Sequence, residues 1–216
     1  MAQAATSHTQ HRVFQSVFKN YSQLELTRAT DRQIAVAGVS HRLAKGMRSS
    51  VAFGVFTSFE HLHRSLLWRR AGDVFLRWIR NNTPSVPTWS WMSFMGPIDY
   101  LDITSTEIEW NRDICLSTAE ESATITAPVT TFTAEMLRDP GVLILDYQPR
   151  ADVENLKCVV VGKGVSGNQD DEVYYVLVVL PAQTSGTGTE YERFGVATLR
   201  KTHLALEYGT ERARII

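Results

Sequence analysis

The sequence predicts an α+β fold in which N-terminal helices pack on a curved, barrel-like antiparallel β-sheet. Apolar residues recur at the helical period early in the chain, whereas short β-branched or alternating runs dominate from Thr88 onward. Many short strands at regular spacing favour a sheet that closes or packs as a sandwich. We expect residues 1–9 to be disordered and residues 10–216 to form a single domain, mainly helical over 10–80 and mainly β over 81–216.

The composition is that of an ordinary globular protein, with 44% hydrophobic and 21% charged residues among 216. The net charge is −1 and the basic residues are scattered along the chain without a basic stripe, so we expect no nucleic-acid partner. No apolar run approaches the roughly 18 residues of a membrane span, and residues 1–10 lack the apolar core of a secretory signal. Cys115 and Cys158 therefore predict free, buried thiols in the reducing cytoplasm.

Two or three helices are predicted first. One starts at His11, and its apolar residues Val13, Phe14, Val17, Phe18 and Tyr21 share one face. A second runs from an N-cap at Thr30 or Asp31 to a stop at Gly46, with Ile34, Val36, Ala37, Val39 and Leu43 as its apolar set. A third, over about 54–64, carries His61 and His63, which diverge by about 200° on a helix. We interpret those two as surface histidines.

The stretch Pro87–Ser93 predicts one arm of a hairpin with an aromatic side. Trp89 and Trp91 stand two residues apart, so on a strand their side chains share a face. The pair Gly96-Pro97 signals a turn. Ile98 and Tyr100 then share a face of the second arm. The structural interpretation is that these aromatic side chains belong to the core, and the functional interpretation is that they form a wall beside a bound ligand.

The remaining strands are predicted from short β-branched or alternating runs. They lie, in order, at residues 66–68, 98–103, 107–110, 113–116, 123–126, 142–146, 156–161, 173–180 and 191–199, with 74–79 either a strand or an amphipathic piece. An edge strand and a loop are predicted over 128–140, loops over 162–171 and 183–189, and a loosely packed tail from Leu204.

Six motifs stand in a distinctive order along the chain. They are the run Phe14…Tyr21-Ser22…Asp31-Arg32…Gly38-Val39, then Leu66-Leu67-Trp68, Pro87–Ser93, Gly96-x-Ile98-x-Tyr100, Tyr175–Leu180 and Tyr191–Val196. This order resembles the segment that follows the catalytic domain in fungal heterokaryon incompatibility (HET) proteins, although Phe14 stands where that family has a Trp. The resemblance covers about residues 14–200 and implies a fungal origin and a shared fold. We expect a stand-alone protein without the HET domain, so that domain's activity is not implied.

Few residues suggest chemistry. No Gly-x-Ser-x-Gly elbow and no metal-binding constellation occurs, so we expect neither a metal nor a cofactor. Gly162-x-Gly164-x-x-Gly167 follows a strand but opens no helix, which indicates a hairpin loop rather than a phosphate cradle. Glu107 and Glu109 share a strand face that we interpret as solvated.

Tyr191 and Arg193 share one face of a predicted strand. Arg193 or Glu192 either pairs across the sheet, or Arg193 and Tyr191 act as catalytic hydrogen-bond donors to a ligand carbonyl or carboxylate. In the second case an apolar wall binds the ligand, and its residues are Trp89, Trp91, Trp68 and Tyr100.

Two main hypotheses follow. The first is a cofactor-free enzyme of fungal natural-product biosynthesis, of the cyclase or pericyclase type, for example a Diels–Alder catalyst acting by proximity on an apolar small-molecule substrate. The alternative is a non-catalytic protein-interaction or regulatory module, and a truncated, inactive product is a third. A ligand-sized cavity beside the tryptophans favours the first, and a packed interior with an exposed apolar patch favours the second. Assembly into a homo-oligomer stays open.

Overall fold

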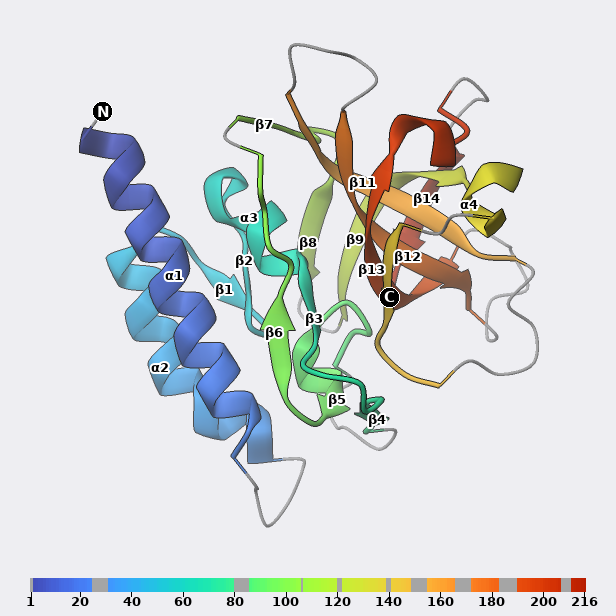
Figure 1. Ribbon diagram of the computed structural model, residues 1–216. Helices are drawn as coiled ribbons and strands as arrows, with labels where there is room; N and C mark the ends of the chain where they lie inside the picture. The colour runs from blue at the N-terminus through green and yellow to red at the C-terminus, as the bar shows by residue number, and fades with distance from the viewer. Residues whose placement is uncertain are drawn as a thin grey trace.

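A computed structural model places two long helices on one side of the molecule and a large β-sheet on the other (Figure 1). The structure describes residues 2–24, 31–79, 86–105, 107–119, 122–138, 141–148, 155–165, 172–182, 190–206 and 211–216. Within them, four α-helices accompany a mostly antiparallel eight-stranded sheet, which confirms the predicted α+β class. No helix in these residues is long and apolar enough to cross a membrane.

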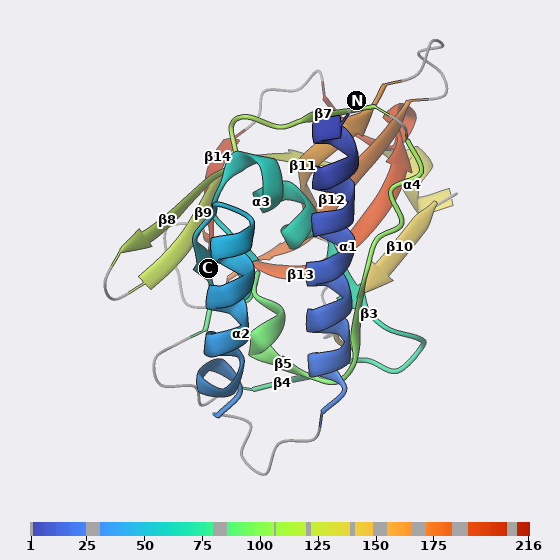
Figure 2. The same ribbon diagram turned by 90° about the vertical axis from the view of Figure 1, so that its left-hand side faces the viewer.

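The two long helices, α1 (Ala2–Ser22) and α2 (Arg32–Gly46), lie side by side on one face of the molecule (Figure 2). α1 begins at Ala2, so residues 2–9 are helical where disorder was predicted, consistent with the high helix propensity of the alanines there. α2 ends at Gly46 as predicted, and Asp31 is its N-cap residue. The other predicted cap, Thr30, lies outside the described residues.

Between helices and sheet lie a hairpin and a short helix. The hairpin joins β1 (Val51–Ala52) to β2 (Val55–Phe56) through Phe53 and Gly54, whose φ angles of 49° and 75° suit a type I′ turn. The helix α3 spans Phe59–Leu66, so the predicted helix over 54–64 began too early.

The prediction that the α3 histidines lie at the surface is wrong, because one ring packs against α1 and the other against the end of β7. His61 and His63 are each 1% exposed. The His61 ring contacts the His11 ring of α1, with Nδ1 and Nε2 2.9 Å apart. His63 points elsewhere, toward the carbonyl oxygen of Asn111. The two rings therefore diverge, as their helical spacing predicts.

Two small sheets follow. One pairs β3 (Trp68–Arg70) with β6 (Ile98–Tyr100), and the other pairs β4 (Arg77–Trp78) with β5 (Phe94–Met95). The predicted hairpin between Pro87–Ser93 and Ile98–Tyr100 is wrong. Its first arm is a turn that runs into the 3₁₀ segment Trp91–Ser93, because the Ser90 hydroxyl accepts a hydrogen bond from the Met92 N–H and caps that segment.

The large sheet is built from the later part of the chain. Its strands are β7 (Ile108–Trp110), β8 (Cys115–Ala119), β9 (Ser122–Thr131), β10 (Val142–Leu145), β11 (Lys157–Gly164), β12 (Val173–Pro181), β13 (Glu190–Arg200) and β14 (Glu211–Ile215). The order is β7-β11-β12-β13-β14-β9-β8, with β10 beside β13. Because β9 also pairs with β11, the five strands β11, β12, β13, β14 and β9 form a closed ring of pairings, antiparallel except between β13 and β14.

Two segments depart from the prediction here. The expected loose tail contains β14, which is one of the ring strands and has Ala213 and Ile215 buried. The expected edge strand and loop over 128–140 instead hold the end of β9 and the short helix α4 (Ala134–Arg138). β14 and the end of β9 both pair with strands distant in the chain, and local sequence does not report such pairing.

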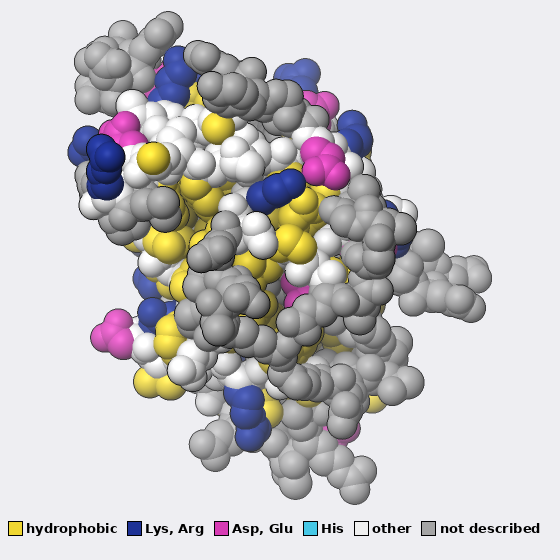
Figure 3. Space-filling view, turned by 90° about the vertical axis from the view of Figure 1, so that its right-hand side faces the viewer, with side chains coloured by type: hydrophobic (Ala, Val, Ile, Leu, Met, Phe, Trp, Pro, Cys, Tyr) yellow, Lys and Arg dark blue, Asp and Glu magenta, His cyan; other side chains and the backbone are white. Residues whose placement is uncertain are grey.

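Alternate residues of β12 face two different apolar clusters. Tyr175, Leu177 and Val179 belong to the cluster inside the ring, which also receives Trp89 and α3 side chains. Val176 and Val178 face an outer cluster beside β10 and α4, and Figure 3 shows hydrophobic side chains gathered on that side of the molecule. Burial of both faces explains the continuous apolar run of this strand.

A third cluster lies between the two long helices and the small sheets. Phe14 and Phe18 of α1, Val36 and Ala44 of α2, and Phe56, Trp68, Trp91, Phe94 and Tyr100 belong to it. Of the two cysteines, Cys158 is buried as predicted, and burial raises the pKa of its thiol. Cys115 is exposed instead, because it lies on β8 at the edge of the sheet.

Candidate functional site

The six residues proposed from the sequence all lie in the interior. Their exposed fractions do not exceed 7%, and they are Trp68, Trp89, Trp91, Tyr100, Tyr191 and Arg193. They do not form one wall: Trp89 and Tyr191 belong to the cluster inside the ring, whereas Trp68, Trp91 and Tyr100 belong to the cluster beneath α1 and α2. None of them lines the groove along β7 that is described below, or the smaller pocket of about 380 Å³ between α2 and the β1–β2 hairpin.

The two tryptophans of the central motif point apart because the backbone turns between them. Trp89 accepts a hydrogen bond of 2.9 Å at its carbonyl oxygen from the indole Nε1 of Trp68. The indole of Trp91 instead donates to the carbonyl oxygen of Gly54, with the two atoms 3.4 Å apart. The Ser90 hydroxyl donates to the carbonyl oxygen of Phe53 over 2.6 Å. This motif therefore connects the β1–β2 turn to β3.

Thr88 extends these connections to the C-terminal end of the sheet. Its backbone N–H donates to the carbonyl oxygen of Ile216 over 3.0 Å. Its Oγ1 accepts from the backbone N–H of Arg193 over 2.9 Å. The central motif is thus a junction between the helical side and the strand ring.

Arg193 forms a fully buried ion pair with Asp146, and both side chains are 0% exposed. Its Nε donates to the Asp146 carboxylate over 2.8 Å, and its two terminal nitrogens donate to the carbonyl oxygens of Leu66 and Trp68. The guanidinium also lies 3.3 Å from the centre of the Trp68 ring. Burial lowers the pKa of Arg193 and raises the pKa of Asp146, and the attraction between them opposes both shifts. All three side-chain nitrogens of Arg193 are thus bonded inside the protein.

The two tyrosines proposed with Arg193 are also packed away. The Tyr100 hydroxyl is buried and has no hydrogen-bond partner among the described residues, and burial raises its pKa, which keeps the phenol neutral. Tyr191 is 2% exposed, and the Lys157 ammonium lies 5.3 Å from the centre of its ring.

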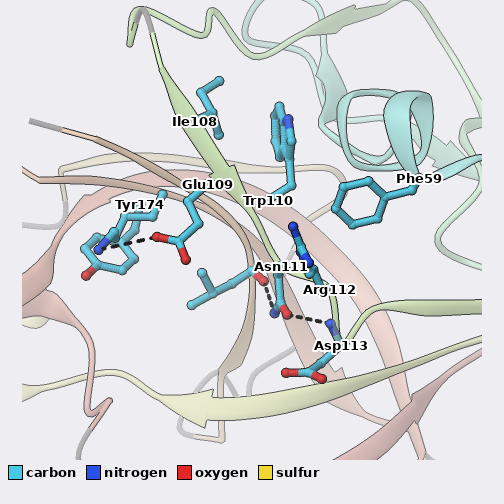
Figure 4. Close-up of a pocket in the computed structure, with 10 residues that line it drawn as sticks. Phe59, Ile108, Glu109, Trp110, Asn111, Arg112, Asp113 and Tyr174 are labelled. Carbon is cyan, nitrogen blue, oxygen red and sulfur yellow. Dashed lines mark hydrogen bonds and ion pairs between the residues drawn. The ribbon is translucent and has the colours of Figure 1, made fainter.

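A groove of about 650 Å³ lies instead along β7 (Figure 4). Its walls come from α3, β7 and the turn after it, β11 and β12, through Phe59, Ile108, Glu109, Trp110, Asn111, Arg112, Asp113, Val160, Lys163 and Tyr174. The sequence located the strand but not the groove. No local signal could have identified it, because it forms where segments distant in the chain meet.

Asn111 holds the end of β7 in place. Its backbone N–H donates to the carbonyl oxygen of Val161 over 3.0 Å, and its side-chain amide donates to the carbonyl oxygen of Val160 over 2.7 Å. The amide oxygen accepts from the Asp113 N–H over 2.9 Å, closing the turn. From α3, Nε2 of His63 lies 2.7 Å from the Asn111 carbonyl oxygen. The strand end is therefore anchored on both sides.

Trp110 packs over a glycine of β11. A Cβ atom at Gly162 would lie 2.6 Å from the Trp110 ring, so only glycine leaves room for the indole. The His63 ring stacks on Trp110 with centroids 5.4 Å apart, and the Arg64 guanidinium lies 5.2 Å from the ring centre. Gly162 and Gly164, predicted to lie in a hairpin loop, are in fact within β11.

Charged groups of both signs lie along the groove. Lys163 pairs with Glu172 at 3.2 Å and with Glu109 at 3.8 Å, and the Tyr174 hydroxyl donates to Glu172 over 3.0 Å. Burial, together with the bond to Glu172, raises the pKa of Tyr174 to about 12. Tyr174 therefore stays protonated at neutral pH and can serve as a donor rather than a base. Among the described residues no group of three metal-binding side chains occurs.

The arrangement of the groove suits recognition more than bond-making. It combines an open strand edge, aromatic rings and charges of both signs. Comparison with family models, curated proteins and solved structures finds no match for this chain.

Proposed function

We propose that the chain is a non-catalytic protein-interaction module that binds an extended segment of a partner protein along β7. The observation that carries the proposal is the open edge of β7, one of the strands that line the groove. Within the described residues β7 pairs only with β11, so its other edge can accept a further strand.

The register identifies the backbone groups that would bind. Hydrogen bonds join the N–H of Val165 to the oxygen of Glu107, and the N–H of Asn111 to the oxygen of Val161. In an antiparallel pair such bonds recur at every second residue, so Glu109 faces Lys163 and bonds toward β11. Ile108 and Trp110 consequently direct their backbone N–H and C=O groups away from β11, toward an added strand.

Side chains beside this edge define the kind of peptide. Figure 4 shows Glu109 and Tyr174 on one side of β7 and Trp110 and Phe59 on the other. The Phe59 ring is 48% exposed and offers an apolar contact. Arg112 is exposed and makes no ion pair within the part of the chain that the structure describes. An extended peptide with an apolar residue for Phe59 and an acidic residue for Arg112 would match this surface.

Two further points support an interaction role. The aromatic residues and the arginine that would serve catalysis are packed in the interior. The motif order resembles the region after the HET domain, for which a partner-binding role is expected. The cofactor-free cyclase predicted from the sequence stays a prediction, and it has no assigned substrate pocket.

The test is a selection of short peptides from a displayed random library on the purified chain, followed by two variants. Ile108→Pro removes the outward N–H without removing a bond to β11. Ile108→Ala loses the same side chain and keeps the N–H, so it is the matched control.

We expect selected peptides to bind the wild type and Ile108→Ala. Their affinity for Ile108→Pro should fall about tenfold or more, because the lost N–H and the proline ring both oppose strand addition. The amides of Ile108 and Trp110 should become protected from hydrogen exchange in the complex. Equal affinity for both variants, or no selected peptide, would contradict the proposal.

A further inference from the structure

The charged groups beside β7 are not balanced. Among the described residues, Lys163 is the only cation that forms an ion pair with Glu109 or Glu172. Its ammonium nitrogen lies 3.2 Å from the Glu172 carboxylate and 3.8 Å from that of Glu109. Two carboxylates therefore share a single ammonium group, which leaves an excess of negative charge on this part of the groove.

Glu109 holds the weaker share of that ammonium group. The Glu172 side chain is 12% exposed and also accepts a hydrogen bond of 3.0 Å from the Tyr174 hydroxyl. The bonds from Lys163 and Tyr174 lower the pKa of Glu172, so this carboxylate is ionised at neutral pH. The Glu109 side chain is 72% exposed, and a second cation can reach it without displacing Lys163 from Glu172.

A strand added along β7 would place one of its residues directly beside Glu109. Ile108 and Trp110 direct their backbone groups outward, so an antiparallel partner forms hydrogen bonds at these two residues and none at Glu109. Such non-hydrogen-bonded pairs have the closest Cα atoms, about 4.5 Å apart, and their side chains share one face of the sheet. The partner residue opposite Glu109 therefore lies on the side of β7 that carries Glu109 and Tyr174 (Figure 4).

The two neighbours of that partner residue point to the other face of the added strand. Figure 4 shows Trp110 and Phe59 on this other side of β7. Both side chains are aromatic, and the Phe59 ring is 48% exposed. The alternation thus favours a charged residue between two apolar residues in the bound segment.

We propose that the partner segment carries a lysine or arginine opposite Glu109, with an apolar residue on each side of it. The cation offsets the excess negative charge that Glu109 and Glu172 leave beside Lys163. The acidic residue expected for Arg112 is a separate position, because Arg112 follows the end of β7. This inference rests on the proposed function, since it requires a strand added along β7, and it specifies the charge and place of one residue of that strand.

Peptide selection on two charge-reversal variants tests the preference. Glu109→Lys and Asp73→Lys make the same change in net charge, and Asp73 is exposed between β3 and β4 and does not line the groove. Peptides selected from a displayed random library on the wild type and on Asp73→Lys should contain Lys or Arg between two apolar residues. Those selected on Glu109→Lys should contain Asp or Glu at that position.

Affinity measurements isolate the contribution of the ion pair. The wild type should bind a selected peptide about threefold more tightly than the same peptide with glutamine in place of the cation. Glu109→Gln should bind the two peptides about equally. The difference seen with the wild type should shrink between about 0.05 M and 0.5 M salt, because salt screens an exposed ion pair.

The backbone variant Ile108→Pro separates this inference from the proposed function. Suppose that selected peptides lose affinity for Ile108→Pro but show no preference for a cation, or keep the same preference with Glu109→Gln. That result would overturn the inference and leave the proposed function standing. Failure to select any peptide, or equal binding to Ile108→Pro and Ile108→Ala, would overturn both.

Discussion

The hydroxyl of Ser90 donates a hydrogen bond of 2.6 Å to the carbonyl oxygen of Phe53, 37 residues earlier in the chain. Phe53 lies in the β1–β2 turn with a positive φ angle, which is unfavourable for a residue with a side chain. The neighbouring Gly54 carbonyl is bound by the Trp91 indole. The central motif thus stabilises a strained turn and, through it, the wall of the pocket beside α2.

Ser90→Ala should lower the free energy of unfolding by about 1–3 kcal/mol, because it leaves the partly buried oxygen of Phe53 and the buried N–H of Met92 without their partner. Urea unfolding measures the change. Ser16→Ala, at an exposed position of α1, is the control and should stay within about 0.5 kcal/mol of wild type. Equal effects of the two variants would show that the Ser90 bonds do not stabilise the fold.

Arg193→Met should cost about 3–5 kcal/mol of stability, because it leaves the carboxylate of Asp146 buried without its partner. Adding Asp146→Leu removes the stranded charge and should recover part of that loss. Chemical denaturation of the two single variants and the double variant gives the coupling between the residues. Additive losses would contradict a direct pairing of the two side chains.

Gly162→Ala should destabilise the protein by about 1–3 kcal/mol, since the new methyl group would collide with the Trp110 ring. Gly38→Ala offers the opposite case, because nothing lies within 4 Å of its added Cβ and the site is inside α2. There the change should stabilise by about 0.5–1 kcal/mol. Thermal unfolding of both variants should therefore shift in opposite directions, and a shared direction would refute the packing argument.

Acidification should weaken the fold through His63. Burial lowers its pKa from 6.5, while its bonds to the carbonyl oxygens of Asn111 and Phe59 partly oppose the shift. The unfolded chain then takes up the proton at higher pH than the native chain. The contribution of His63 to stability is therefore complete above about pH 6.5 and is lost as the pH falls below it.

The measurement compares the unfolding midpoint of the wild type with that of His63→Gln between about pH 8 and pH 5. Every other histidine is common to both proteins and cancels in the difference. The stability of the wild type relative to the variant should decline toward the acid end. A constant difference across this range would contradict the assigned direction of the pKa shift.

The local sequence was a good guide where periodicity alone decides the element. The stop of α2 at Gly46 and the strands β10 and β12 lie close to their predicted positions. Gly46 follows a run with helical period, and β12 is a run of β-branched and aromatic residues. These patterns repeat over a few residues, so they can be recognised in the sequence without information about tertiary contacts.

The motif at Trp89–Trp91 shows where such reasoning ends. Its alternation matches a strand, yet the Ser90 hydroxyl caps a 3₁₀ segment and the two indoles enter different clusters. Arg193 was selected because its residue type suits ligand binding, but it is bonded to Asp146 in the core. Residue type suggested the chemistry of each group, whereas the identity of its neighbour determined its role.

The sequence by itself determined the α+β class, the helical first third and most strand positions, because these depend on side-chain spacing within each segment. Tertiary structure alone decided that the tail contributes β14 to the strand ring, that the predicted site residues are interior, and that pockets lie beside β7 and α2. Those features depend on hydrogen bonds and packing between residues tens of positions apart, and such contacts produce no periodic pattern in the amino-acid sequence.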